Sequence, residues 1–173
     1  LFQNFPNQNY QIIQLGVNNG INSKHYSYLI KKFKCNCKII GFDSWKGLSE
    51  DWRGMSKGRY KGSQFFSKPQ PPDFCIFKEG NVADELNKFL TKENERLLNL
   101  VHFNLDTYNP TKLCLSLLKP YLKKGTILIF DDFYGYPGWS IHENKAFEEF
   151  LIESQMKYKF VCFGKFECAM EIL

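Results

Sequence analysis

Short apolar runs alternate with segments of helical periodicity along most of this chain. The runs have the length of buried strands, and most of them end near Gly or Asp, which is typical of strands that lead into loops. Predicted strands cover residues 11–15, 38–42, 74–77, 98–105, 126–130, 159–163 and 167–172. Between them, apolar residues recur at intervals of three and four, the spacing of one helix face. Predicted helices cover residues 22–34, 82–90, 110–122 and 143–154.

The order of these elements predicts the fold class. Strands that alternate with helices form a parallel sheet, because each helix carries the chain back to the edge where the strand began. The last two strands are separated by a few residues that include Gly164 and Lys165. These are too few for a helical crossover, so the strands form an antiparallel hairpin. The sequence therefore predicts one α/β domain over residues 1–173, with a Rossmann-like, mostly parallel sheet, a C-terminal antiparallel hairpin and helices on both faces.

Residues 44–72 interrupt this alternation. They are rich in Gly, Lys, Ser and Pro, and they show no sustained period. A long irregular segment inside a compact domain is usually functional or mobile. We expect this segment to act as a lid that orders over bound ligands and excludes water.

Charge and hydropathy exclude some partners. The 173 residues carry a formal net charge of +5, but the lysines are scattered and belong to no nucleic-acid motif, which favours a solvated basic surface. No apolar run approaches the ~20 residues of a membrane span, and no secretory leader is visible. The chain begins with Leu1, so it can be a segment of a longer protein. We expect neither a nucleic-acid partner nor membrane association.

The six cysteines fit a reducing compartment. Cys35 and Cys37 form a C-x-C, which has the wrong spacing for a zinc knuckle and no partner pair. The other cysteines lie in apolar stretches and are typical of small buried side chains. This pattern predicts a cytoplasmic protein.

A glycine turn follows the first predicted strand. Gly16 and Gly20 stand in the stretch QLGVNNG, residues 14–20, directly before a predicted helix. Glycines here let the backbone approach a ligand and leave helix amides free to bind it. The spacing is G-x-x-x-G, whereas a pyrophosphate is gripped by G-x-G-x-x-G. A plain tight turn explains the glycines equally well. If the turn binds a ligand, the spacing favours the methionine end of S-adenosylmethionine over a dinucleotide.

Acidic and amide residues follow several predicted strands. Asp43 lies about twenty residues beyond the glycines, where an acidic residue commonly accepts hydrogen bonds from ribose hydroxyls, although it can also simply start a turn. The fourth and fifth strands are followed by Asn104, Asp106, Asp131 and Asp132. Oxygen donors gathered there would suit Mg²⁺, which would hold a substrate hydroxyl and lower its pKa while a carboxylate removes the proton. The alternative is that these residues cap the following helices.

Three stretches resemble the macrocin O-methyltransferase-like family of class I S-adenosylmethionine-dependent methyltransferases. Residues 41–52, GFDSWKGLSEDW, are similar to that family's GFDSFEGLPEDW. Residues 106–111, DTYNPT, resemble its DLYxST segment, and residues 130–147 resemble its FDDYxxYPGW…KAF region. The matches keep the family's order and, with their flanking elements, cover nearly the whole chain. Methyltransferase sheets of this class end in an antiparallel hairpin and dehydrogenase sheets usually do not, so a dehydrogenase is disfavoured.

The resemblance implies a cofactor site and a metal site. The residues implied for S-adenosylmethionine are Gln14, Gly16, Val17, Gly20, Asn22, Ser23, Asp43, Ser44, Trp45, Gly80, Asn81, Val82 and Asn104. Among these, the first turn would hold the methionine part, Asp43 the ribose, and residues 80–82 the adenine. The implied Mg²⁺ ligands are Asn104, Asp131 and Asp132, and the implied base is Asp106. His142, in the loop beyond the aspartates, is a further catalytic candidate, although a lone His at a helix entry is more often incidental.

Two residues depart from the family pattern. Gln14 stands where the family usually has Glu, so the methionine ammonium group would meet an amide that carries no charge. Asn104 stands where the first Asp of the metal set is expected. An Asn carbonyl can coordinate Mg²⁺, and the resulting Asp-Asp-Asn set is similar to that of catechol O-methyltransferase, but the site loses one negative charge.

These features together predict a methyltransferase that uses S-adenosylmethionine to methylate a hydroxyl of a sugar or another small molecule, with or without Mg²⁺. Two alternatives stay open. One is a metal-independent small-molecule methyltransferase, and the other is a catalytically weakened relative that still binds the cofactor. The expected partner is a small-molecule acceptor, and assembly into a homo-oligomer is left open.

Overall fold

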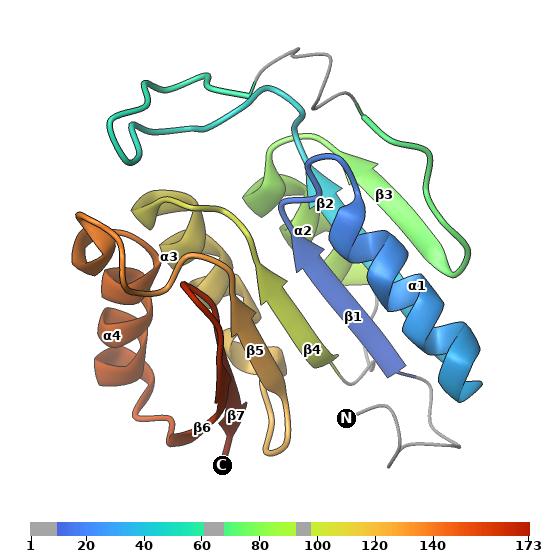
Figure 1. The fold of residues 1–173 in the computed structure, drawn as a ribbon. Coiled ribbons are helices and arrows are strands. Elements are labelled where there is room, and N and C mark those ends of the chain that lie inside the picture. Colours follow the sequence, from blue (N-terminus) through green and yellow to red (C-terminus); the bar gives the residue numbers. More distant parts are fainter. Residues whose placement is uncertain (1–9, 61–67, 93–97) are drawn as a thin grey trace.

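The computed structural model describes residues 10–60, 68–92 and 98–173. Within these ranges the chain forms a seven-stranded sheet flanked by helices (Figure 1). The strands are β1 (Tyr10–Leu15), β2 (Cys37–Asp43), β3 (Cys75–Glu79), β4 (Leu98–Phe103), β5 (Ile127–Phe130), β6 (Tyr158–Phe163) and β7 (Cys168–Ile172). The helices are α1 (Ile21–Phe33), α2 (Val82–Lys92), α3 (Tyr108–Leu118) and α4 (Glu143–Ser154), with short 3₁₀ helices η2 (Lys119–Tyr121) and η3 (Trp139–Ile141). Among the described residues, no helix has the length and apolar composition that crossing a membrane requires.

The strand order is β3-β2-β1-β4-β5-β7-β6. β1 pairs in parallel with β2 and β4, and the parallel arrangement continues to β3 on one side and β5 on the other. β7 runs antiparallel to β5, and β6 runs antiparallel to β7. The predicted parallel sheet with a terminal hairpin is therefore confirmed. Because the chain moves outward from β1 to β3 and then returns to β4, β1 and β4 flank the switch point at which open α/β sheets bind ligands.

Helices cover both faces of the sheet, as predicted. α1 packs on one face, and α2, α3 and α4 pack on the other (Figure 1). The alternation of side chains along β1 explains this arrangement. Ile12 packs in one cluster with Tyr26 of α1, whereas Ile13 packs in the other with Leu115 of α3. Burying an apolar side chain of this size stabilises the fold by about 1.5–3 kcal/mol relative to leaving it exposed.

The structure differs from the sequence prediction at a few element ends. β4 ends at Phe103, before residue 105, because the chain turns sharply and Asp106 has a φ of 63°. β3 begins only at Cys75, because Phe74 also has a φ of 63°. The helix predicted for residues 110–122 leaves α-helical geometry after Leu118, next to a proline that lacks the N–H of the helical ladder. Of the predicted irregular segment, residues 61–67 lie outside the described residues.

Candidate functional site

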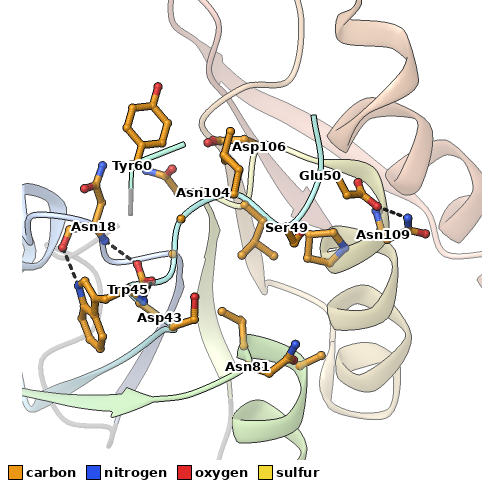
Figure 2. Close-up of a pocket in the computed structure, with 18 of the residues that line it drawn as sticks. Asn18, Asp43, Trp45, Ser49, Glu50, Tyr60, Asn81, Asn104, Asp106 and Asn109 are labelled. Atoms are coloured by element: carbon orange, nitrogen blue, oxygen red, sulfur yellow. Dashed lines mark hydrogen bonds between the residues drawn. The ribbon is translucent and has the colours of Figure 1, made fainter. Parts of the chain in front are cut away.

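A cleft of about 370 Å³ opens at the carboxyl ends of β1, β2 and β4, next to the switch point (Figure 2). It is bounded by the segment 44–60 and by the N-terminal ends of α2 and α3. A volume of this size is typical of small-molecule sites. Its lining residues are Gly16, Asn18, Asp43, Ser44, Trp45, Gly47, Leu48, Ser49, Glu50, Tyr60, Asn81, Val82, Ala83, Asn104, Leu105, Asp106, Asn109, Pro110 and Leu113.

Gly16 lets the ends of three strands come together at the cleft. Its backbone N–H donates to the Phe42 carbonyl at 2.9 Å, and the Asn104 N–H donates to the Leu15 carbonyl at 2.8 Å. Gly16 has a φ of 86°, and a Cβ atom there would lie 1.9 Å from the Asn104 carbonyl oxygen. A side chain does not fit at this position, so the backbone itself requires the glycine.

The Asp43 carboxylate joins the loops after β1 and β2. One oxygen accepts hydrogen bonds from the N–H groups of Val17 and Asn18, each at 2.8 Å, and the other accepts from the Trp45 N–H at 2.7 Å. The Trp45 indole in turn donates to the Asn18 carbonyl at 3.0 Å (Figure 2). Because a carboxylate offers about four acceptor positions, Asp43 both starts the turn and keeps room for a ligand hydroxyl.

Gln14 is fully buried beneath the glycine turn and does not line the cleft. Its amide nitrogen donates to the Gly16 carbonyl at 3.1 Å, and its amide oxygen accepts from the Ser23 hydroxyl at 2.6 Å. An ionised Glu could accept from Ser23 but could not donate to Gly16. The amide at residue 14 therefore matches its neighbours, and it supports the turn from below.

Asp131 ends a row of buried hydrogen bonds. The Tyr26 hydroxyl lies 2.8 Å from His102 Nδ1, and His102 Nε2 lies 2.7 Å from one Asp131 oxygen. Burial and the nearby Asp131 charge raise the pKa of Tyr26 far above its usual range. Because a carboxylate accepts hydrogen bonds, Nε2–H donates to Asp131, and in that tautomer Nδ1 accepts from the protonated Tyr26 hydroxyl. The other Asp131 oxygen accepts from the side-chain amides of Asn104, at 2.5 Å, and Asn22, at 3.5 Å. Both carboxylate oxygens are thus engaged inside the protein.

Glu143, the first residue of α4, connects the loops after β4 and β5. One of its buried oxygens accepts from the N–H groups of Leu105 at 3.1 Å and Asp106 at 3.2 Å, and the other accepts from the Asp132 N–H at 3.4 Å. These bonds hold Asp106 in a left-handed backbone conformation, which non-glycine residues keep only where the surroundings impose it. Burial, reinforced by the charge of Asp106, raises the pKa of Glu143 well above its usual range.

Asp106 and Asp132 form an acidic pair beside the cleft. Their carboxyl groups lie close enough for each to shift the pKa of the other. Burial is the main cause that raises the pKa of Asp106 to about 8, and the charge of Asp132 adds to it. Burial and the charge of Asp131 raise the pKa of Asp132 to about 6, whereas Arg53 opposes this rise. The pair therefore shares a proton at neutral pH.

Besides the contacts of Trp45, two further contacts tie the segment 44–60 to the rest of the domain. In the first, Glu50 accepts hydrogen bonds from the Asn109 backbone N–H, at 3.3 Å, and from the Asn109 side chain (Figure 2). A carboxylate at the N-terminus of α3 is favourable because the helix dipole is positive there.

The second contact joins the segment to the loop after β5 and to the β6–β7 turn. Trp52 is 6% exposed, and its ring packs edge to face on Tyr136 with centroids 5.9 Å apart. The Arg53 guanidinium lies 5.0, 4.7 and 5.0 Å from the ring centroids of Trp52, Tyr136 and Phe166. Arg53 also pairs with Asp132 at 3.6 Å. These contacts hold Trp52 and Arg53 against the loop after β5 and the β6–β7 turn, next to Asp132 of the acidic pair.

The structure gathers many of the residues that the sequence indicated. The predicted residues that line the cleft are Gly16, Asp43, Ser44, Trp45, Asn81, Val82, Asn104 and Asp106. The predicted residues that lie outside its lining are Gln14, Val17, Gly20, Asn22, Ser23, Gly80, Asp131, Asp132 and His142. His142 is half-buried at the start of α4, where burial lowers its pKa. The roles assigned to all these residues stay predictions.

Several residues that shape the site were not predicted from the sequence. Glu50, Tyr60 and Asn109 line the cleft, and Arg53 and Glu143 lie beside it. An acidic residue in the first turn of a helix was visible at residue 143, but this position is common for acidic residues and signals no contact by itself. Arg53 gave no local signal, because its partners lie far away in the sequence.

The predicted metal ligands do not present converging donors. Asn104 turns its amide nitrogen toward Asp131, so its carbonyl oxygen faces away from that carboxylate. The Asp131 oxygens are occupied, and Asp132 pairs with Arg53. Among the described residues, no group of three or more His, Cys, Asp and Glu side chains could hold a metal ion. As they lie, these side chains do not fit Mg²⁺, and the magnesium site stays a prediction from the resemblance.

The sheet order, the terminal antiparallel pair and the helices on both faces define the fold of class I Rossmann-like methyltransferases. Among similar solved structures, the calicheamicin methyltransferase CalS11 has a TM-score of 0.75 and 22% sequence identity, over 93% of this chain and 71% of CalS11. The O-methyltransferase NovP has a TM-score of 0.65 and 14% identity, over 93% of this chain and 71% of NovP. MycE, a mycinamycin-pathway methyltransferase in complex with Mg and SAH, has a TM-score of 0.59 and 14% identity, over 99% and 46% of the two chains. No family model and no curated protein matches the sequence.

Proposed function

We propose that this chain binds S-adenosylmethionine in the cleft and transfers its methyl group to a hydroxyl of a sugar or another small molecule. The observation that carries the proposal is that Gly16, Asp43 and Asn104 meet in one cleft at the switch point of a methyltransferase-type sheet. The resemblance to the macrocin O-methyltransferase-like family supports it. CalS11 is named as a TDP-rhamnose 3′-O-methyltransferase, which is why a sugar hydroxyl is the preferred acceptor.

The charge of the lining suits this cofactor. Asp43, Glu50 and Asp106 line the cleft, and the described lining residues include no Lys or Arg. S-adenosylmethionine carries a sulfonium and an ammonium group, which a cleft lined by carboxylates attracts. The pyrophosphate of a dinucleotide would be repelled. The lining therefore favours S-adenosylmethionine over NAD.

Each part of the cofactor has a counterpart in the cleft under this proposal. The methionine part lies along the backbone of Gly16 and the side chain of Asn104. A ribose hydroxyl takes the remaining acceptor position of Asp43. The adenine lies between Trp45, in the loop after β2, and Val82, the first residue of α2; both residues line the cleft.

Methyl transfer depends mainly on placement. The acceptor oxygen attacks the methyl carbon in line with the carbon–sulfur bond, this bond breaks, and S-adenosylhomocysteine leaves. Asp106 is the carboxylate that we propose takes the hydroxyl proton. With a pKa of about 8, Asp106 takes the proton in its ionised form, so methyl transfer should become faster as the pH rises through this value. No step is assigned to a metal ion, because the present side chains do not converge on one.

Titration calorimetry tests the proposal. The protein is expected to bind S-adenosylmethionine and S-adenosylhomocysteine and not to bind NAD. Asp43→Asn removes a negative charge and replaces one of the two carboxylate oxygens, which together accept three backbone hydrogen bonds, with an NH₂ donor. The affinity for S-adenosylhomocysteine should therefore fall by at least about tenfold. Asp84→Asn makes the same chemical change at an exposed position on α2 and should bind like the wild type.

Binding of NAD without binding of either methyl-cofactor form would overturn the proposal. Where the cofactor binds, mass spectrometry after incubation with a panel of sugars and natural-product scaffolds identifies the acceptor. Cofactor binding without transfer to any member of a broad panel would favour the alternative of a catalytically weakened relative.

A further inference from the structure

The carboxylates beside the cleft are balanced by a cation from another part of the chain. Asp106, Asp131, Asp132 and Glu143 gather where β4 and β5 end and α4 begins. Among the Lys and Arg side chains of the described ranges, that of Arg53 pairs with this group: its guanidinium nitrogen lies 3.6 Å from an Asp132 carboxylate oxygen. Carboxylates this close repel one another, and a positive charge beside them reduces this repulsion.

Arg53 is held in place by three aromatic rings. Its guanidinium lies within about 5 Å of the ring centroids of Trp52, Tyr136 and Phe166, an arrangement in which the ring faces attract the cation. The Arg53 side chain is 32% exposed and that of Asp132 is 15% exposed. The pair is thus partly withdrawn from water, which strengthens its attraction. A planar guanidinium stacks on such rings, whereas an ammonium group is attracted to them only as a point charge.

We propose that Arg53 supplies the positive charge of this carboxylate cluster in place of a divalent cation, and that it positions Asp132 and, through it, Asp106. The inference rests on the proposed function of the cleft. It follows because a predicted metal ligand already has protein partners: the two Asp131 carboxylate oxygens are hydrogen-bonded to His102 and to Asn104. Mg²⁺ demands a near-octahedral set of oxygen ligands, whereas a guanidinium needs one carboxylate beside it. Methyl transfer by this chain is then independent of metal.

The test is binding of Mg²⁺ alone, measured by calorimetry and by the shift of the melting temperature. The wild type should bind Mg²⁺ only weakly, with a Kd above about 1 mM, because Arg53 already balances the carboxylates. Arg53→Met removes the charge but keeps a long side chain, so its affinity for Mg²⁺ should rise at least about tenfold. Adding Asp132→Asn to Arg53→Met should abolish this gain. Arg53→Lys keeps the charge and should resemble the wild type.

Arg59→Met is the matched control. Arg59 lies in the same segment, with its guanidinium 5.9 Å from the Tyr60 ring, and its loss should leave Mg²⁺ binding unchanged. The proposal is overturned if the wild type binds Mg²⁺ below about 0.1 mM and Asp132→Asn removes that binding. It is equally overturned if folded Arg53→Met gains no affinity. Should Arg53→Met fail to fold, the titrations of the wild type and of Arg53→Lys still decide.

A second readout separates this proposal from the proposed function. Addition of EDTA should leave the affinity of the wild type for S-adenosylhomocysteine unchanged. If the wild type binds no S-adenosylhomocysteine at all, the proposed function fails, whereas the Mg²⁺ titrations still report on Arg53. If S-adenosylhomocysteine binds only when Mg²⁺ is present, the proposed function stands and the assignment of Arg53 falls.

Discussion

Single residues at the ends of strands decide the shape of the cleft. Gly16 and Asp43 could be identified from the sequence, because each follows an apolar run directly and strand ends are where such sheets bind ligands. Glu143 could not. Its carboxylate binds backbone N–H groups 38 and 37 positions earlier in the chain, and no local pattern carries that information. Contacts between a side chain and a distant backbone become visible only when the loops are placed in space.

Replacing Gly16 with Ala should severely destabilise the fold. The new Cβ would lie 1.9 Å from the Asn104 carbonyl oxygen, so β1 and β4 would have to separate. We expect a loss of more than about 3 kcal/mol in the free energy of unfolding, measured by urea denaturation.

Gly54→Ala is the matched control for that substitution. Gly54 has a φ of 74°, close to that of Gly16, but its Cβ would meet no atom within 4 Å. The cost should be limited to the left-handed backbone, about 1–2 kcal/mol. Equal losses for the two variants would show that the contact with Asn104 does not matter.

At the scale of elements, α3 and α4 are joined by a small polar group on their shared surface. Glu149 of α4 accepts hydrogen bonds from the Tyr108 hydroxyl at 2.6 Å and from the Lys112 ammonium group at 2.7 Å. The hydrogen bond from Lys112, followed by that from Tyr108, lowers the pKa of Glu149. The ionised carboxylate is therefore the form that stabilises the helix pair.

This group makes part of the stability depend on pH. A carboxyl group with a lowered pKa in the folded state contributes stability above its ordinary pKa and loses it as the pH falls through the folded-state value. Glu149→Gln should therefore melt at a lower temperature than the wild type at pH 7. The difference should shrink as the pH falls below the ordinary pKa of Glu and vanish once the pH lies below the lowered pKa of Glu149, where its carboxyl group is as neutral as the Gln amide. Glu148→Gln, an exposed neighbour, is the control, and a constant difference across this pH range would contradict the assignment.

The terminal hairpin shows what the pattern of the sequence could and could not determine. The short connection between the last two predicted strands was enough to predict antiparallel pairing. Which of the two strands lies inside the sheet was not determined, because both runs are apolar. In the structure β7 pairs with β5 and is largely buried, whereas β6 forms the edge and leaves Phe160 44% and Phe163 60% exposed.

At the scale of the whole molecule, the segment 44–60 brings distant parts of the chain to one place. Its irregular composition predicted a lid, which stays a prediction. In the structure Glu50, Trp52 and Arg53 dock this segment onto the rest of the domain. Its partners could not be predicted, since Asn109 lies in the first turn of α3 whereas Tyr136 and Phe166 belong to two separate loops. The alternation of strands and helices fixed the sheet, but not the contacts between loops.

Trp52→Ala should release one side of this segment. The change removes the ring that packs on Tyr136 and one of the three rings around Arg53. Amide hydrogen exchange over residues 48–60 should accelerate by at least about tenfold, because fewer buried contacts oppose local opening. Trp52→Phe keeps an aromatic ring and should exchange nearly like the wild type. Unchanged exchange in Trp52→Ala would mean that the packing of Trp52 on Tyr136 does not hold the segment in place.

The buried row from Tyr26 through His102 to Asp131 limits how such a chain can diverge. An apolar residue at position 102 would leave a buried hydroxyl on α1 and a carboxylate at the site without their partner. Each orphaned group costs about 1–3 kcal/mol, comparable to a large part of the stability margin of a small domain. Substitutions at these three positions are therefore tolerated together rather than singly. In homologous sequences the residues at positions 26, 102 and 131 should therefore covary.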